Sequence, residues 1–207
     1  MKSKIEIYGI VLASGQSIRM GKPKLLLPWK GSSLIEHILT KMKKVTFKDI
    51  KVVIPDQNEC LKTIVEQYNC SSIYNDSPYM GLGHSLSLAI QSLPLSSDAA
   101  IILLGDQPTL SAEDIRRVWF AFKRVRSRQA YCPKIIIQMK YRDGRVGHPS
   151  LFSHHFFSDL RSLVGDKGGK DIICRNSRYI FLCTSGNEYP HDIDTPNDYN
   201  LLLKEEG

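Results

Sequence analysis

The side chains best suited to chemistry gather early in the chain, where residues 12–24 read LASGQSIRMGKPK. A small-residue turn at 13–15 interrupts an apolar run, and the outward N–H groups of such a turn can bind phosphate oxygens. Arg19, Lys22 and Lys24 follow within ten residues of the turn. Arginine binds phosphate as a planar fork, and lysine binds it as a mobile point charge. The stretch predicts a phosphate site, with Lys24 in an exposed loop beside the phosphates.

Two better-known phosphate loops are excluded by the spacing. The P-loop pattern GxxxxGK[ST] fails because Met20 stands at its second glycine and Pro23 follows Lys22. The dinucleotide pattern GxGxxG fails because Ser17 stands at its second glycine. An ordinary turn followed by a solvated basic loop remains the alternative that the turn alone leaves open.

Three later positions carry further polar chemistry. Asp106 follows the apolar run AAIILL, and a carboxylate at the end of a buried strand stands where α/β sheets bind ligands. Asp194 precedes Thr195 and Pro196, which are typical of a helix cap with proline in the first helical position. His148 lies between Gly147 and Pro149, so we expect it in an exposed loop. Each residue also has a purely structural alternative, as a turn cap or a buried histidine.

Helix and strand signals alternate, which predicts an α/β fold. The capping box that begins at Ser33 predicts a helix whose apolar face continues to Met42. Ser85 is expected to cap a helix over 86–93, after a turn through 75–78. Further strands are expected at 5–12, 51–54, 72–74, 99–104, 135–141 and 179–183. Further helices are expected at 59–68 and from 111 onward, and a closing helix is expected after Pro196, ending at 203. Since no linker or repeat interrupts the pattern, we expect one domain over 1–207.

Composition limits the class of protein. The chain has 207 residues with 42% hydrophobic composition and no apolar run long enough for a membrane helix. The N-terminus, MKSKIEIYGI, is expected to form a strand rather than a signal peptide. Five scattered cysteines without a CxxC motif predict reduced, buried thiols in a cytoplasmic protein, not a zinc site or a disulfide framework.

The formal net charge of +7 favours anionic partners. Its densest cluster is Lys123, Arg124, Arg126 and Arg128, which has no interleaved aromatic residues. Cations are favourable at the carboxyl end of a helix. We therefore expect a solvated helix end there rather than a nucleic-acid surface.

The stretch LASGQSIRMGKPK resembles the signature LAxGxSxRMGxxK of the MobA-like nucleotidyltransferases, which transfer a nucleoside monophosphate from a nucleoside triphosphate. The continuation KLLLPW and the motifs GDQP, GHPSLF and DIDTP resemble the branch that attaches CMP to the molybdenum cofactor. The chain also resembles an accessory protein of purine catabolism needed for xanthine dehydrogenase maturation. The resemblance implies an α/β three-layer sandwich with a Rossmann-like, mostly parallel sheet of the nucleotide-diphospho-sugar transferase type. In the motif GDKGGKD, Lys170 stands where the family usually has arginine.

The resemblance implies transfer of CMP from CTP to molybdenum-molybdopterin, giving pyrophosphate and the cytosine dinucleotide for a molybdenum hydroxylase. Arg19, Lys24 and Asp106 would be catalytic. Asp106 and Asp194 would hold Mg²⁺, with Mn²⁺ as the other candidate, and His148 would contact the acceptor. The implied nucleotide-binding residues are Leu12, Ala13, Ser14, Gly15, Asn75, Gly81 and Ser85. A recipient molybdoenzyme or its maturation factor is a further expected partner, whereas a membrane or a nucleic acid is not.

Three alternatives stay open, namely a GTP-using transferase, a sugar-phosphate nucleotidyltransferase and a non-catalytic carrier of the cofactor. Ser14 bears on the first, because the GTP branch has glycine there and the CTP branch usually has alanine. A Cβ at this point narrows the site and so favours a pyrimidine. The serine hydroxyl could bond either the base edge or its own backbone.

Overall fold

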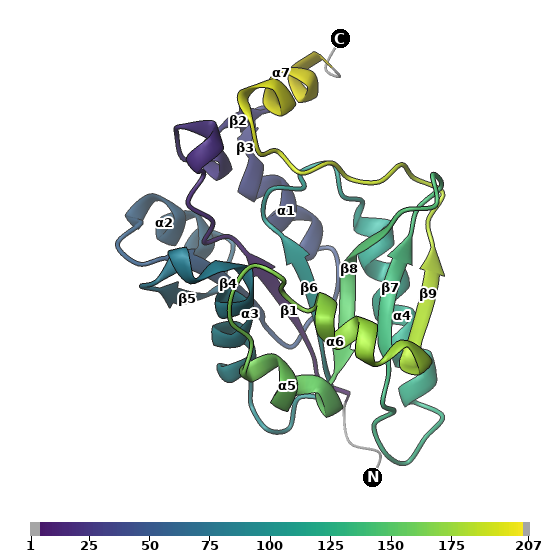
Figure 1. Cartoon of the computed structure of the whole chain (residues 1–207). Coiled ribbons are helices and arrows are strands. Elements are labelled where there is room, and N and C mark those ends of the chain that lie inside the picture. Colours follow the sequence, from purple (N-terminus) through teal and green to yellow (C-terminus); the bar gives the residue numbers. More distant parts are fainter. Residues whose placement is uncertain (1–4, 205–207) are drawn as a thin grey trace.

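The structure, a computed structural model, describes residues 5–204. Residues 1–4, the start of the segment expected to form a strand rather than a signal peptide, lie outside the described residues. Figure 1 shows a central sheet with helices against both of its faces. The expected three-layer α/β architecture is confirmed. Of the helices within 5–204, none combines the length and apolar character needed to cross a membrane.

Within residues 5–204, seven strands form one sheet in the order β5-β4-β1-β6-β8-β7-β9. Among these strands only β8 runs antiparallel to its neighbours. The strands are β1 (Ile7–Leu12), β4 (Ile50–Pro55), β5 (Ser71–Asn75), β6 (Ala99–Leu104), β7 (Ile136–Lys140), β8 (Val146–Ser153) and β9 (Ile180–Thr184). The strands β1 and β6 are apolar throughout because both faces of a parallel sheet are covered by helices.

Two separate cores fill the space on either side of the sheet. In β1, Ile7 and Val11 join one core, whereas Tyr8 and Ile10 join the other. The first core is covered by α1 (Leu34–Met42), α2 (Glu59–Gln67) and α4 (Ala112–Arg126). The second is covered by α3 (Gly81–Gln91), α5 (Phe157–Arg161) and α6 (Lys170–Arg175). This alternation follows from the two-residue period of side chains along a strand.

A small third cluster joins residues 20–34 to the C-terminal helix, beside one end of the sheet (Figure 1). It combines Trp29 from the hairpin β2 (Pro28–Trp29) and β3 (Ser32–Ser33) with Leu202 from α7 (Pro196–Lys204). The cluster holds the stretch before α7, including Ile193, against residues 20–34. Residues far apart in sequence are thereby brought to one edge of the sheet.

The expected helix caps at Ser33 and Thr195 are present. Glu36 accepts a hydrogen bond from Ser33 N at 2.7 Å, as the capping box requires. At α7, the Asp198 carboxylate accepts from Thr195 N at 2.7 Å, and Thr195 Oγ1 accepts from Asp198 N at 3.2 Å. Pro196 takes the first helical position. The basic cluster lies at the end of α4 as expected, but Arg126 is not solvated, because its side chain is only 13% exposed and pairs with Asp98 at 2.8 Å.

The GHP segment corrects one expectation. It lies in β8, between β6 and β7, and not in an exposed loop. The pairing with β7 jumps from Gln138↔Ser150 to Met139↔Gly147, so His148 and Pro149 form a bulge. A bulge leaves residues out of the ladder, and this explains how a strand flanked on both sides accommodates a proline.

Two smaller expectations were also wrong. Ser85 does not cap a helix, because α3 already begins at Gly81 and Ser85 lies in its second turn. The five cysteines are free as expected, and all lie within the described residues. Cys60 and Cys174, however, are exposed rather than buried, because they lie on outward faces of α2 and α6.

Candidate functional site

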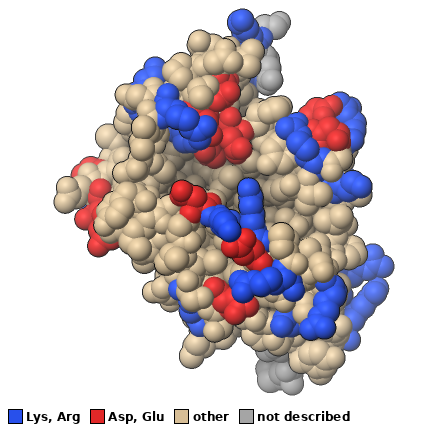
Figure 2. Space-filling model, in the orientation of Figure 1, with Lys and Arg blue, Asp and Glu red and all other residues tan. Residues whose placement is uncertain are grey.

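A pocket of about 580 Å³ opens where β1 and β6 end. Figure 2 shows charged side chains of both signs on this face of the molecule, around a hollow. The expected site residues that line the pocket are Leu12, Ala13, Ser14, Gly15, Arg19, Lys24, Gly81, Ser85, Asp106 and Asp194. Asn75 lies directly behind this lining, and His148 lies outside it. The carboxyl end of a parallel sheet is where α/β proteins bind ligands.

The turn after β1 is tied to both neighbouring strands. Ala13 N donates to Val53 O at 2.8 Å, and Gly105 N donates to Leu12 O at 2.9 Å. Beyond it, the segment 13–18, which we call the signature loop, borders a second cavity of about 560 Å³ on its other side. A Cβ built on Gly15 meets nothing within 4 Å among the described residues. The signature loop therefore stands open on both sides, and its glycine is not required by packing.

Lys24 is the centre of the charged groups in the pocket. Its Nζ lies 2.5 Å from Asp106 Oδ2 and 2.7 Å from Asp194 Oδ1, and its side chain is only 9% exposed. Arg19 reaches the other oxygen of Asp194 at 2.7 Å. The expected exposed position of Lys24 is therefore wrong, because two carboxylates from distant segments enclose its ammonium group. Arg19, at 70% exposure, remains accessible at the rim.

The electrostatics follow from this arrangement. Burial alone would lower the pKa of Lys24, but the charges and hydrogen bonds of Asp106 and Asp194 together raise it above its ordinary value. Partial removal from water and the negative charge of Asp106 raise the pKa of the neighbouring Asp192. Lys24 therefore stays protonated, surrounded by three carboxyl groups.

Sequence reasoning missed the residues that position Asp194. Ile193 N donates to Asp106 O at 2.9 Å, so the segment before α7 runs beside the GDQP turn. Gln107, fully buried, donates from its side chain to Asp192 Oδ1 at 2.9 Å. The repeated aspartates of DIDTP were the available signal for Asp192. The role of Gln107 could not be read from a tetrapeptide.

The donor set fits a hard divalent cation. Asp106 Oδ1 is buried and has no hydrogen-bond partner among the described residues, so it keeps an unused acceptor. Lys24 and Arg19 carry two positive charges against three carboxyl groups. Within residues 5–204 no cluster of three or more His, Cys, Asp or Glu side chains forms a closed metal site. Mg²⁺ needs no such cage, since it keeps waters and substrate phosphates among its oxygen ligands.

Ser14 is buried and bonded within the protein. Ser14 Oγ lies 2.8 Å from Ser85 Oγ, and Asn75 Nδ2 donates to both hydroxyl oxygens at 3.2 and 3.1 Å. The amide of Asn75 is oriented by Ser77 N, which donates to its Oδ1 at 2.9 Å. This serine–asparagine network fixes the wall of the pocket. It also uses the Ser14 hydroxyl in a way that neither sequence alternative described.

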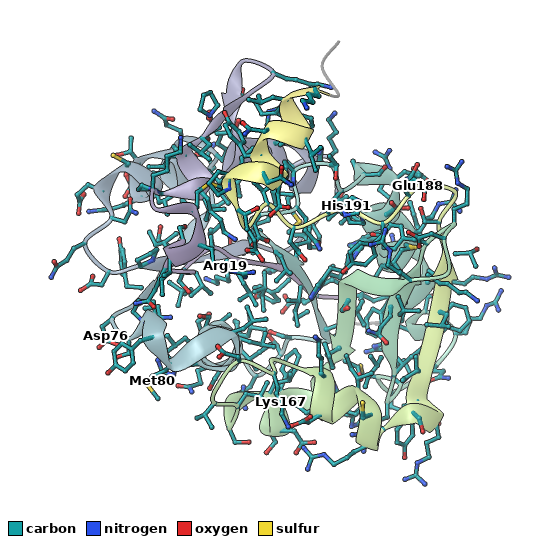
Figure 3. The ribbon with its side chains drawn as sticks, turned by 45° about the horizontal axis from the view of Figure 1, so that its top comes forward. Arg19, Asp76, Met80, Lys167, Glu188 and His191 are labelled. Carbon is teal, nitrogen blue, oxygen red and sulfur yellow. The ribbon has the colours of Figure 1, made fainter. Side chains whose placement is uncertain are left out.

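The opposite wall is a tight joint between α3 and the loop 164–168. Gly83 N donates to Gly165 O at 2.7 Å, and Gly165 N donates to Met80 O at 3.0 Å. Gly81 has φ +84°, and a Cβ there would lie 2.7 Å from the carbonyl carbon of Gly165. Asp166 lines the pocket from this wall, which sequence reasoning did not foresee. In Figure 3, Arg19 lies on one side of the hollow, and Met80 and Lys167 lie on the other.

His148 lies behind the pocket, beside the end of β6. Its Nδ1 lies 3.0 Å from Ile102 O, a contact in which the ring nitrogen must donate. Burial lowers the pKa of His148, so the ring is held neutral with Nδ1 protonated. The bulge in β8 is what turns this side chain toward β6.

Comparison with known proteins assigns the chain to a family. Over 96% of both chains, this sequence is 25% identical to the purine catabolism protein PucB of Bacillus subtilis. It is 25% identical to the molybdenum cofactor cytidylyltransferase of Escherichia coli over 92% of both chains. It is 34% identical to a probable molybdenum cofactor guanylyltransferase of Bacillus cereus, over only 54% of this chain and 52% of the other.

Solved structures agree with these sequence matches. The structure of Rv0371c from Mycobacterium tuberculosis superimposes with a TM-score of 0.84 at 26% identity, covering 98% of this chain and 99% of that one. The same protein in complex with manganese has a TM-score of 0.82 at 24% identity, covering 98% of this chain and all of the other. The fold is that of the nucleotide-diphospho-sugar transferases. The family description "MobA-like NTP transferase domain" matches residues 9–179, and the chain is therefore a member of the MobA-like NTP transferase family.

Proposed function

We propose that this family member is a cytoplasmic molybdenum cofactor cytidylyltransferase. It transfers CMP from CTP to molybdenum-molybdopterin, releases pyrophosphate and supplies the cytosine dinucleotide cofactor to a molybdenum hydroxylase. The single observation that carries the proposal is the meeting of Lys24, Asp106 and Asp194 in one pocket beside the signature loop. A cofactor carrier would not need a buried lysine between two carboxylates at the end of a parallel sheet.

In the proposed reaction, an acceptor phosphate oxygen attacks the α-phosphorus of CTP in line. The bond to the oxygen that bridges the α- and β-phosphorus breaks, and pyrophosphate leaves with the negative charge. Such a reaction depends on positioning and charge stabilisation rather than on a protein nucleophile. The signature-loop N–H groups would bind the phosphates, and Arg19 and Lys24 would stabilise the charge that develops there.

Asp106 and Asp194 are the groups that would hold Mg²⁺ or Mn²⁺. When bound, the metal ion supplies positive charge to the phosphate oxygens. Support comes from the unused Oδ1 of Asp106 and from the manganese complex of a structural neighbour. In the described structure, the ammonium of Lys24 contacts the same two carboxylates, so Lys24 would exchange that contact for the phosphates.

The choice of CTP rests on Ser14 and on the near full-length relatives. The Ser14 Cβ lies in the pocket wall, and Ser85 and Asn75 hold it there. A fixed side chain narrows the site, which favours a pyrimidine over a purine. GTP remains the second candidate, because the relative with higher identity over half of the chain is a probable guanylyltransferase.

A pyrophosphate-release assay tests the proposal. Purified protein, Mg²⁺ and molybdenum-molybdopterin are incubated with CTP or GTP in parallel, with Asp106→Asn as the inactive control. We expect release that requires the acceptor and is faster with CTP. Faster release with GTP would reassign the base, and acceptor binding without any release would indicate a carrier.

A further inference from the structure

The charges that line the pocket are divided between its two walls. Arg19 and Lys24, with the three carboxyl groups around them, lie beside the signature loop. The α3 wall contributes a carboxylate of its own, Asp166, whose Oδ1 lies 2.3 Å from the position that a Cβ on Gly81 would take. Among the described residues, this carboxylate makes no hydrogen bond or ion pair. The pocket therefore has one wall whose cations are paired with carboxylates and a second wall that presents the unpaired carboxylate of Asp166.

Asp166 is held in place by its backbone rather than by its side chain. The preceding residue, Gly165, is bonded to both Met80 and Gly83, and these contacts leave no room for a Cβ at Gly81 or Gly83. Of the neighbouring cations, Lys167 pairs with Asp171, its Nζ lying 3.6 Å from that carboxylate, and neither Lys167 nor Lys170 lines the pocket. The backbone next to Asp166 is therefore fixed, and this holds the Asp166 carboxylate at the pocket.

The chemistry of a carboxylate decides what it can bind. An ionised carboxylate only accepts hydrogen bonds, and it repels phosphate. A nucleotide whose phosphates lie against Arg19 and Lys24 presents its ribose next, and the ribose 2′- and 3′-hydroxyls are adjacent donors. Two oxygens of one carboxylate can accept from both. Because Asp166 is exposed at the pocket mouth, whereas the Ser14–Asn75–Ser85 network is buried, the ribose suits Asp166 better than the base does.

We propose that Asp166 binds the ribose diol of the nucleoside triphosphate and so makes the site specific for ribonucleotides. This inference rests on the proposed function only in requiring that a nucleoside triphosphate binds. It does not depend on which base is chosen or which acceptor is used.

The test is calorimetric titration of the purified protein with CTP, 2′-deoxy-CTP and 3′-deoxy-CTP, each with Mg²⁺. A hydrogen bond to a charged group is large enough to give the unmodified protein about a tenfold preference for CTP over either deoxy form. Asp166→Ala should bring the three affinities to within about twofold of one another. The matched control is Asp159→Ala, an exposed aspartate outside the pocket, which should keep the tenfold preference.

The outcomes separate this inference from the proposed function. Equal binding of CTP and its deoxy forms by the unmodified protein, or an unchanged preference in Asp166→Ala, would overturn the ribose assignment alone. A variant that loses discrimination between CTP and UTP, but keeps discrimination against the deoxy forms, would move Asp166 to the base and also overturn it. If no nucleoside triphosphate binds the unmodified protein, the proposed function fails and this inference fails with it.

Discussion

The two walls of the pocket are built in opposite ways. The signature loop has a cavity on each side, and a methyl group on Gly15 would touch nothing among the described residues. The joint between α3 and the loop 164–168 is closed, since a methyl group on Gly81 would collide with the Gly165 backbone. Glycine in the tight wall is explained by the folded protein itself. Packing does not explain Gly15 in the open wall, so we infer that a bound ligand needs the space that a side chain would fill.

The largest effect on turnover is expected from substitutions of Asp106 and Asp194, the carboxylates beside the signature loop. Asp106→Asn and Asp194→Asn should each reduce turnover by about 10³-fold, because each removes a charge from the same site. The double variant should be little worse than either single one, since removing either residue breaks the same unit. Steady-state kinetics with Mg²⁺ measure this. Multiplying losses would show that the two aspartates act separately.

Lys24→Met should reduce turnover by about 10²–10³-fold, whereas the affinity for a divalent metal ion should increase. Without the ammonium group, the carboxylates should bind Mn²⁺ about tenfold more tightly in the absence of nucleotide. Electron paramagnetic resonance of free Mn²⁺ during titration measures that affinity. Lys22→Met is the matched control, because Lys22 does not line the 580 Å³ pocket and lies over the Tyr199 ring. Weaker Mn²⁺ binding in Lys24→Met would contradict the shared position of lysine and metal.

A pair of glycine substitutions tests the comparison of the walls directly. Gly81→Ala should cost about 2–4 kcal/mol in the free energy of unfolding, because φ is +84° and the added methyl meets backbone. Gly15→Ala should leave stability equal, or raise it by up to about 1 kcal/mol. It should nevertheless raise the KM for CTP about tenfold, because the methyl occupies ligand space. Denaturant unfolding measures the stability of both variants, and steady-state kinetics measure their KM for CTP. A stability loss in Gly15→Ala, together with unchanged stability in Gly81→Ala, would contradict the comparison.

A smaller effect is expected on base choice. Ser14→Gly removes the Cβ from the pocket wall and one member of the serine–asparagine network. The preference for CTP over GTP should fall by about threefold to tenfold, since the steric part of such discrimination is modest. The ratio of kcat/KM for the two triphosphates measures it. An unchanged ratio would show that this wall does not read the size of the base.

The smallest effect concerns pH and His148, behind the pocket. Its pKa is lowered in the folded state, so between that pKa and about 6.5 the unfolded chain binds a proton that the folded protein does not. Stability is therefore retained above pH 6.5 and lost on acidification, by at most about 1.4 kcal/mol per pH unit. His148→Asn keeps a donor for Ile102 O and should reduce this acid dependence. If the unfolding free energy of His148→Asn changes between pH 5 and 7 as much as that of the unmodified protein, His148 is not the source of the acid dependence.

Much of the fold could be predicted because single segments carry its signals. The apolar run of β6 and the caps at Ser33 and Thr195 are local patterns with local causes. The strand β8 was missed because Gly147 and Pro149 argue against a strand, and only the pairing with β7 reveals the bulge. The start of α3 was missed because it has no side-chain cap, and Gly165, far along the chain, instead bonds Met80 and Gly83 on either side of Gly81.

The candidate site was predictable residue by residue but not as an arrangement. Lys24, Asp106 and Asp194 each came from a separate motif, and nothing in the motifs says that one ammonium group joins the two carboxylates. The Ser14 hydroxyl was expected to bond the base edge or its own backbone, whereas it bonds Asn75 and Ser85. Contacts across more than sixty residues depend on the packing of the whole sheet, which no short pattern encodes.

The proposed reaction transfers the α-phosphorus of CTP to the acceptor. The most direct test is incubation of the protein, Mg²⁺ and molybdenum-molybdopterin with CTP labelled at the α-phosphate, followed by separation of the products. We expect the label to enter the dinucleotide together with the cytidine, in amounts equal to the pyrophosphate released. Label that remains in CTP, or that is released as free CMP while the acceptor stays unchanged, would contradict it.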